Sequence, residues 1–119
     1  MGDKILLVDD DEDLVESLGD SLELRGYSVL LATSGKRGIE LYSKNHPCIV
    51  FMDVKMPEMD GYEAFSNIKK IDKLAKILLV TGHEIKNKTH DAILIGLLGV
   101  MIKPINIQKY IDVIKKYNC

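Results

Sequence analysis

The sequence has no tryptophan, only two cysteines and three prolines, and no long apolar run. Without about twenty consecutive apolar residues there is no candidate membrane span, and the opening MGDKILLVDD lacks the features of a cleaved signal peptide. Cys48 opens an apolar run and Cys119 is the last residue, so we expect two free thiols rather than a disulfide. These absences predict a protein of the cytoplasm.

An excess of charge of one sign is also missing. The 16 basic and 18 acidic residues give a net charge of -2, with the signs mixed along the chain. This pattern offers no basic stripe for nucleic acid and no basic amphipathic helix for a membrane surface, which disfavours both partners. The three histidines (His46, His83 and His90) have no metal-ligand spacing, and the chain contains neither GxGxxG nor a P-loop. A nucleotide enzyme is therefore not expected.

What the chain does contain suits one compact domain. Its 119 residues, 46% hydrophobic and 29% charged, can bury one core and leave no room for a separate output domain, so we expect a single domain over residues 1–119. Short apolar runs alternate with segments of helical period, which predicts five βα units around a parallel sheet covered on both faces. The expected strands are residues 4–8, 27–31, 48–52, 76–81 and 100–102. The expected helices are residues 12–25, two that begin near Ser34 and Gly61, residues 84–97, and one that follows Asn106.

Polar residues follow the expected strands at the edge where an open parallel sheet binds its ligands. They are Asp9, Asp10 and Asp11 after the first strand, Asp53 after the third, Thr81 at the end of the fourth and Lys103 after the fifth. An aspartate at this position can simply cap a helix, and we assign that role to Asp13. Further aspartates beside it would only add repulsion, which predicts a binding role for Asp9 and Asp10.

Two carboxylates about 4 Å apart repel by roughly 4 kcal/mol at an effective dielectric constant near 20. A bound cation reverses this cost, and Mg²⁺ prefers a few carboxylates together with phosphate oxygens. A carboxylate beside that ion can attack phosphorus as a nucleophile, with Lys103 and the Thr81 hydroxyl contacting the transferring oxygens. The strand-end residues therefore predict phosphoryl chemistry.

Four motifs carry a resemblance to a known family over nearly the whole length: KILLVDDDED, FMDVKMPEMDG, ILLVTG and MIKP. The chain resembles the receiver domains of two-component response regulators. The resemblance implies a flavodoxin-like, doubly wound (βα)5 fold, a three-layer α/β sandwich whose five-stranded parallel sheet has the order 2-1-3-4-5. It also implies that the protein is a signalling module that promotes its own phosphorylation and dephosphorylation rather than an enzyme with a separate substrate.

The resemblance assigns a role to each site residue. It makes Asp53 the phosphoacceptor, Asp10 a direct Mg²⁺ ligand, Asp9 a ligand through water, and the Lys55 backbone carbonyl a further ligand. Thr81 and Lys103 would contact the phosphoryl oxygens, and Pro104 matches a proline that often follows a cis bond. The implied phosphodonor is a histidine kinase or phosphotransfer protein. The implied target binds the face formed by the fourth helix, fifth strand and fifth helix.

The chain departs from the family at several positions. Val100 stands where an aromatic residue is usual, so we expect activation to be read through the Thr81 loop and the fourth helix. Leu97 and Leu98 replace small and acidic residues, so the charged pairs of receiver dimers look incomplete and any homodimer is expected to be weak. The apolar run 92–102 predicts that Leu97 or Leu98 is exposed to a partner; the alternative is a better-buried fourth helix. Lys55 and His83 lie where the family tunes the lifetime of the acyl phosphate.

Two other functions compete with this interpretation. A pseudo-receiver would bind partners without phosphorylation; Val100 favours it and the complete set of site residues opposes it. An aspartate-nucleophile phosphohydrolase would need a second acid two residues after the nucleophile, where this chain has Lys55.

Overall fold

The sheet forms from strands that alternate with helices along the chain. The computed structural model describes residues 4–82 and 86–119. The elements are β1 (Lys4–Val8), α1 (Glu12–Glu23), β2 (Ser28–Ala32), α2 (Gly35–Asn45), β3 (Ile49–Asp53), α3 (Gly61–Ile71), β4 (Ile77–Thr81), α4 (Lys86–Leu94), β5 (Gly99–Ile102) and α5 (Ile107–Lys116). The paired strands are parallel and their order is β2-β1-β3-β4-β5, as the resemblance implied.

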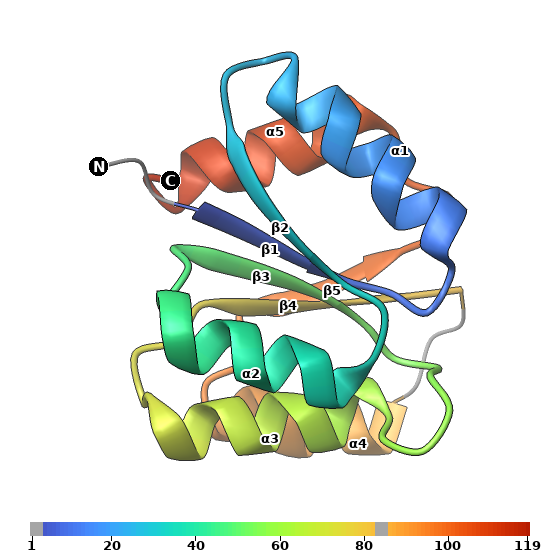
Figure 1. Ribbon diagram of the computed structural model, residues 1–119. Helices are drawn as coiled ribbons and strands as arrows, with labels where there is room; N and C mark the ends of the chain where they lie inside the picture. The colour runs from blue at the N-terminus through green and yellow to red at the C-terminus, as the bar shows by residue number, and fades with distance from the viewer. Residues whose placement is uncertain (1–3, 83–85) are drawn as a thin grey trace.

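Three layers build the domain, with helices on both faces of the sheet. Figure 1 shows α1 and α5 on one face and α2, α3 and α4 on the other. Every residue of β3 and β4 is buried, which explains why these strands are nearly continuous in apolar residues. One core cluster centres on Leu6, Met52 and Phe65, and the other on Leu7, Phe51 and Ile114. The predicted flavodoxin-like fold is confirmed.

Side-chain caps fix the starts of the helices near the carboxyl edge of the sheet. Ser34 caps α2 and Asn106 caps α5, as expected. The prediction that Asp13 caps α1 is wrong, because Asp11 does so: its carboxylate accepts a hydrogen bond from the Leu14 N–H at 3.1 Å. Asp13 lies inside the first turn, where a negative charge still interacts favourably with the helix dipole.

The expectation of two free thiols is also wrong. Cys48 and Cys119 form a disulfide, with their Cα atoms 5.9 Å apart. Helix α5 runs back from the carboxyl edge of the sheet and ends beside the start of β3, so residues 71 apart in sequence meet. A sequence motif does not reveal this pairing, because only the topology brings the two ends together.

The segment around α4 differs from its prediction. The expected start at Glu84 lies outside the described residues, and the helix ends at Leu94 rather than Leu97. Gly96 then adopts φ +106° and turns the chain inward, so Leu97 is 5% exposed. Leu98 is half-buried against the core, so neither leucine is the exposed residue that we expected. Exposed apolar side chains do occur here, but they are Ile93, Leu94 and Ile95. Over the described ranges, no helix has the length and apolarity to cross a membrane.

Candidate functional site

The register of the sheet brings the predicted residues to one edge. Asp53 pairs with Val80, and Thr81 pairs with Ile102, so the ends of β3, β4 and β5 are aligned. Asp9 directly follows β1, whose last residue is in register with the residue before Asp53. Residues from four strands therefore converge at the carboxyl edge of the sheet.

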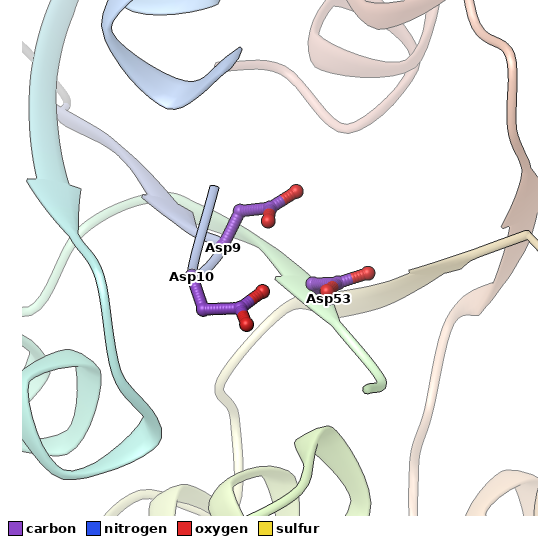
Figure 2. Close-up of side chains that lie close together, drawn as sticks. All are labelled: Asp9, Asp10 and Asp53. Carbon is purple, nitrogen blue, oxygen red and sulfur yellow. The ribbon is translucent and has the colours of Figure 1, made fainter. Parts of the chain in front are cut away.

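Three carboxylates form the centre of this site. One oxygen from each of Asp9, Asp10 and Asp53 lies within 4.8 Å of the others. Figure 2 shows Asp9 and Asp10 at the end of β1 and Asp53 at the end of β3. Asp9 and Asp53 are buried and Asp10 is exposed, so the cluster is open to solvent on one side. This arrangement of oxygen donors suits a hard divalent cation.

Lys103 lies between two of these carboxylates. Its Nζ donates to Asp9 Oδ2 at 2.9 Å and lies 3.2 Å from Asp53 Oδ1. The Lys103 N–H donates to the Thr81 carbonyl at 2.8 Å, and the following peptide bond to Pro104 is cis, as the resemblance implied. The ion pair with Asp9 was not predicted, because a strand-end position does not specify which neighbour a flexible lysine reaches.

The electrostatics of the site shift two pKa values. Burial raises the pKa of Asp53, and the charge of Asp9 adds to this rise, while Lys103 opposes it. Burial alone would lower the pKa of Lys103, but hydrogen bonds and charge from Asp9 and Asp53 outweigh burial and raise it. The ammonium is therefore fully charged at neutral pH. Ionised Asp53 keeps an unfavourable energy that a bound cation would relieve.

Backbone packing holds Asp53 in place. The Val54 N–H donates to the Val80 carbonyl at 3.1 Å, and the Gly61 N–H donates to the Val54 carbonyl at 2.8 Å. A Cβ atom at Gly61 would collide with the Asp53 carbonyl oxygen, so this position needs glycine. The Asp60-Gly61 pair thus has two structural roles: Asp60 caps α3, and Gly61 lets that helix start against the backbone of Asp53.

Comparison with known proteins identifies this arrangement. The family model of the response regulator receiver domain matches residues 5–115. Chemotaxis protein CheY of Thermotoga maritima is 34% identical over 117 residues, which cover 98% of this chain and 98% of that protein. The chain belongs to the response regulator receiver family.

Solved structures of receivers agree with this assignment. A CheY-like receiver domain protein from Methanospirillum hungatei has a TM-score of 0.93 at 27% identity, covering 99% of this chain and 95% of its own. The CheX–CheY–BeF3–Mg²⁺ complex from Borrelia burgdorferi matches with a TM-score of 0.87 at 25% identity, covering 97% of this chain and 89% of that chain.

The other residues that the sequence predicts for this receiver domain lie on β4, on β5 and in the loop after β3, where the structure describes them. Thr81 is buried at the end of β4, and Lys55 is exposed in the loop that follows β3. Val100 on β5 is half-buried and packs against the core, so no aromatic ring occupies its position. His83 lies outside the described residues. The structure brings Thr81 to the edge that carries Asp53, while the role of the Lys55 carbonyl stays a prediction.

Sequence reasoning missed one residue beside the site. Tyr110 on α5 is buried and packs edge-on against Phe51, with ring centroids 5.0 Å apart. Burial raises the pKa of Tyr110, and the charges of Lys103, Asp9 and Asp53 also act on it. In the sequence, Tyr110 is one of the apolar residues that recur with helical period in α5. This periodicity identifies the face of the helix that is buried, but it does not show which charged residues lie next to that face.

Proposed function

We propose that this protein is a phosphoacceptor signalling module in which Asp53 receives a phosphoryl group from a histidine kinase or phosphotransfer protein. The observation that carries the proposal is the Lys103 ammonium held between Asp9 and Asp53 beside a third carboxylate, Asp10. A structural ion pair needs one carboxylate, whereas this cluster leaves negative charge in excess. Such an arrangement is suited to a cation and a phosphoryl group together.

The transfer itself needs little from the protein beyond positioning. An Asp53 carboxylate oxygen attacks phosphorus, the P–N bond to the donor imidazole breaks, and that nitrogen keeps the electron pair and is protonated from solvent. Lys103 neutralises charge on the transferring oxygens, and the Thr81 hydroxyl donates to one of them. In hydrolysis, water attacks phosphorus at the same site, the P–O bond to Asp53 breaks, and inorganic phosphate leaves while the Asp53 carboxylate is restored. The protein thus promotes both reactions without a separate substrate.

The carboxylates fit Mg²⁺ as the cofactor. Asp10 and Asp53 would bind it directly, Asp9 through water, and the Lys55 carbonyl would complete the protein ligands. The bound ion would supply positive charge to the phosphoryl oxygens and would offset the burial and the repulsion by Asp9 that raise the pKa of Asp53. The Borrelia burgdorferi complex holds BeF3 and Mg²⁺, and this relative supports the assignment.

Incubation with acetyl phosphate and Mg²⁺ tests the proposal. We expect intact-mass spectrometry to show one added phosphoryl group that hydroxylamine removes. Asp53→Ala should abolish the modification, whereas Asp13→Ala, which removes an exposed carboxylate of α1, should leave it unchanged. Retained modification of Asp53→Ala would exclude Asp53 as the acceptor. No modification of the wild type by acetyl phosphate or a phosphorylated donor protein would favour the pseudo-receiver.

For signalling, we propose that phosphorylation shifts the Thr81 loop and α4, and that a target reads the α4-β5-α5 face. Ile93 and Ile102 offer exposed apolar contacts on α4 and β5, and Val100 has no ring to move. Hydrogen exchange with and without beryllofluoride tests this route. We expect changed protection between Gly82 and Ile102, and unchanged protection at full occupancy of Asp53 would exclude it.

A further inference from the structure

A groove between α3 and α4 lies apart from the phosphorylation site and from the contacts proposed above. Figure 1 shows the two helices side by side on one face of the sheet. The groove is an open hollow with a volume of about 910 Å³, and its lining residues are Ser66, Lys69, Lys70, Lys73, Leu94, Ile95 and Gly96. Ile93 and Ile102 are not among them, so this surface is distinct from the one that we assign to the downstream target.

One wall of the groove is apolar and exposed. Leu94 is 73% exposed and Ile95 is 53% exposed, although both belong to the segment that packs Leu97 into the core. Leu74 lies in the turn after α3, next to the lining residue Lys73, and is 86% exposed. Single exposed apolar residues are ordinary, but neighbouring ones in a groove are typical of a binding surface.

The other wall is basic. Lys69, Lys70 and Lys73 come from α3 and the turn that follows it, and no described carboxylate lies within ion-pair distance of them. Lys69 and Lys70 lie in the last turn of α3, where a positive charge interacts favourably with the helix dipole. Lys73 lies beyond that turn, so the dipole does not account for it.

Lys69 is fixed rather than flexible. Its ammonium donates to the carbonyls of Lys73 at 2.6 Å and Ala75 at 3.1 Å. It also lies against Gly96, where a Cβ atom would come within 2.8 Å of Nζ. Lys69 therefore joins the turn after α3 to the turn after α4, and it holds the basic wall opposite the apolar one.

The charge along these two helices is not uniform. Asp60 is the N-cap of α3 and Glu63 lies in its first turn. Asp91 on α4 lines the neighbouring hollow with Ile95. A polyanion that extends along the helices would meet these carboxylates, which disfavours nucleic acid. A partner with a local cluster of acidic residues and a few apolar anchors meets no such conflict.

We propose that the α3–α4 groove binds an acidic amphipathic helix of another protein. Its leucine-like anchors contact Leu94 and Ile95, and its carboxylates pair with Lys70 and Lys73 over the C-terminal turn of α3. Helices commonly dock in grooves through residues at i, i+3, i+4 and i+7. The proposal does not depend on phosphorylation of Asp53, so its test uses the unmodified protein.

The probe is a designed helical peptide of about sixteen residues with leucine at those positions and glutamate between them. A second peptide carries lysine in place of glutamate. We expect fluorescence anisotropy to show binding of the acidic peptide, weaker binding at high salt, and no binding of the basic one. Equal binding of the two peptides, or no binding of the acidic one, would overturn the proposal.

Matched variants place the binding on the groove. Lys70→Glu with Lys73→Glu should weaken it by about tenfold or more, as should Leu94→Ser with Ile95→Ser. The controls Lys36→Glu with Lys44→Glu on α2, and Leu24→Ser after α1, change exposed residues elsewhere on the surface and should have no effect. Circular dichroism verifies that each variant folds. If the control and groove variants weaken binding alike, the surface is wrong.

Two further measurements distinguish the proposed helix from other possible occupants of the groove. The acidic residues of α1 and the exposed Leu24 that follows this helix make a second copy of the chain an alternative occupant. Sedimentation velocity would detect it as self-association that Leu94→Ser with Ile95→Ser removes. Flotation with phosphatidylglycerol vesicles tests a membrane surface. We expect a monomer that does not float, and either self-association through the groove or vesicle binding that needs Lys70 and Lys73 would overturn the assignment to a protein helix.

Discussion

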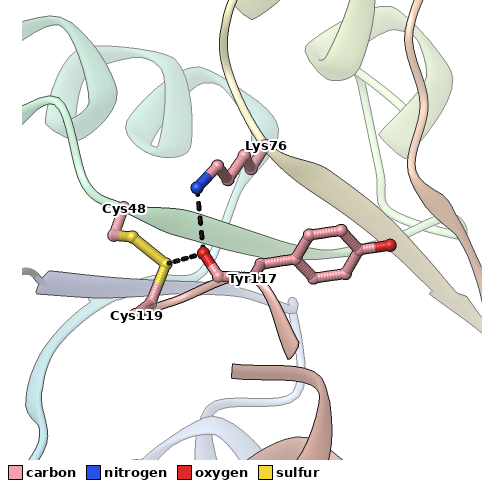
Figure 3. Close-up of a disulfide and its surroundings, with 4 residues drawn as sticks. All are labelled: Cys48, Lys76, Tyr117 and Cys119. Carbon is pink, nitrogen blue, oxygen red and sulfur yellow. Dashed lines mark hydrogen bonds between the residues drawn. A yellow bond between two sulfur atoms is a disulfide. The ribbon is translucent and has the colours of Figure 1, made fainter. Parts of the chain in front are cut away.

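The two edges of the sheet are built on opposite principles. The carboxyl edge concentrates like charges in Asp9, Asp10 and Asp53, with Lys103 as the counter-charge that joins two of them. At the amino edge, polar groups are paired with complementary partners, and a disulfide joins two segments of the chain. In Figure 3 the Cys48–Cys119 disulfide lies beside Lys76, whose Nζ donates to the Tyr117 carbonyl at 2.9 Å.

Other polar groups at the amino edge are also paired. The Tyr42 hydroxyl donates to Asp72 at 2.8 Å, His46 Nδ1 lies 3.7 Å from the same carboxylate, and Lys4 donates to Asn45 at 3.2 Å. We infer from this difference that the two edges have different roles. The contacts of the amino edge stabilise the fold, and the carboxyl edge keeps unfavourable electrostatic energy that the proposed cation and phosphoryl group would relieve.

The largest expected effect on this comparison comes from the disulfide. Its residues are 71 apart, and a cross-link of this span stabilises by about 4 kcal/mol in the chain-entropy model. We expect Cys119→Ser, or reduction of the wild type, to lower the free energy of unfolding by up to that amount while phosphorylation of Asp53 persists. Urea denaturation measures the first and intact mass the second. Reductant should have no effect on the variant.

If reduction has no effect on stability, the proposed stabilising role of the amino edge loses its main support. If reduced and oxidised wild type unfold at the same urea concentration, the disulfide contributes nothing to stability. The compartment matters here, because the sequence predicts a protein of the cytoplasm and that compartment favours thiols over disulfides. In that compartment we would expect the reduced form to carry out the proposed signalling.

Next in size is Lys103→Met, which leaves Asp9 and Asp53 without their counter-charge. We expect the free energy of unfolding to fall by about 2 kcal/mol at pH 7 without metal. This is less than the loss for a fully buried ion pair, because Lys103 is partly exposed. The pKa of Lys103 is raised, so its contribution is complete below its ordinary value of 10.5. Acidification or Mg²⁺ should restore part of the loss in thermal melts. Lys109→Met, exposed on α5, is the control.

A smaller effect of opposite sign is expected for Asp53→Asn. Because the pKa of Asp53 is raised above 3.8, its ionisation destabilises the folded state as pH rises through that pKa. The variant should therefore gain about 1 kcal/mol of stability at pH 7 without metal and nothing at pH 3, since a buried charge that is also repelled by Asp9 is removed. Exposed Asp10→Asn should gain less. Melting curves across pH test this, and a destabilised Asp53→Asn at pH 7 would contradict it.

The smallest expected effect lies at the amino edge. Tyr42→Phe removes the hydrogen bond that is the largest cause of the lowered pKa of Asp72, and should cost about 1 kcal/mol at neutral pH. Asp72 favours folding above its ordinary pKa of 3.8, so the cost should shrink as pH falls through its lowered value. Mg²⁺ should not change it. Tyr27→Phe is a half-buried control, and an equal loss there would make the hydrogen bond irrelevant.

The sequence predicted the carboxyl edge better than the amino edge, for a physical reason. Residues that directly follow buried strands must meet at one edge of a parallel sheet, so Asp9, Asp53, Thr81 and Lys103 were found from their positions alone. The strand order itself came from the resemblance. At the amino edge the contacts join the ends of helices to distant strands, and no local pattern links Cys119 to Cys48 or Tyr42 to Asp72.

The errors at α4 and α1 have a more local origin. Apolar composition could not show that Gly96 turns the chain and buries Leu97, because periodicity assumes that the helix continues. Several aspartates in a row satisfy the preference for an N-cap equally, so Asp11 and Asp13 differ only in backbone geometry that the sequence does not display.

The contacts of Cys48 also determine how the protein would respond to mechanical force. Its N–H donates to the Lys4 carbonyl at 2.8 Å, and its sulfur is bonded to Cys119, so both ends of the described chain are tied to one residue. A load applied between Lys4 and Cys119 in the oxidised protein would pass through the start of β1 and β3. Helix α5 would be shielded from it. After reduction the load would instead reach α5, because only its noncovalent packing would then join Cys119 to the sheet.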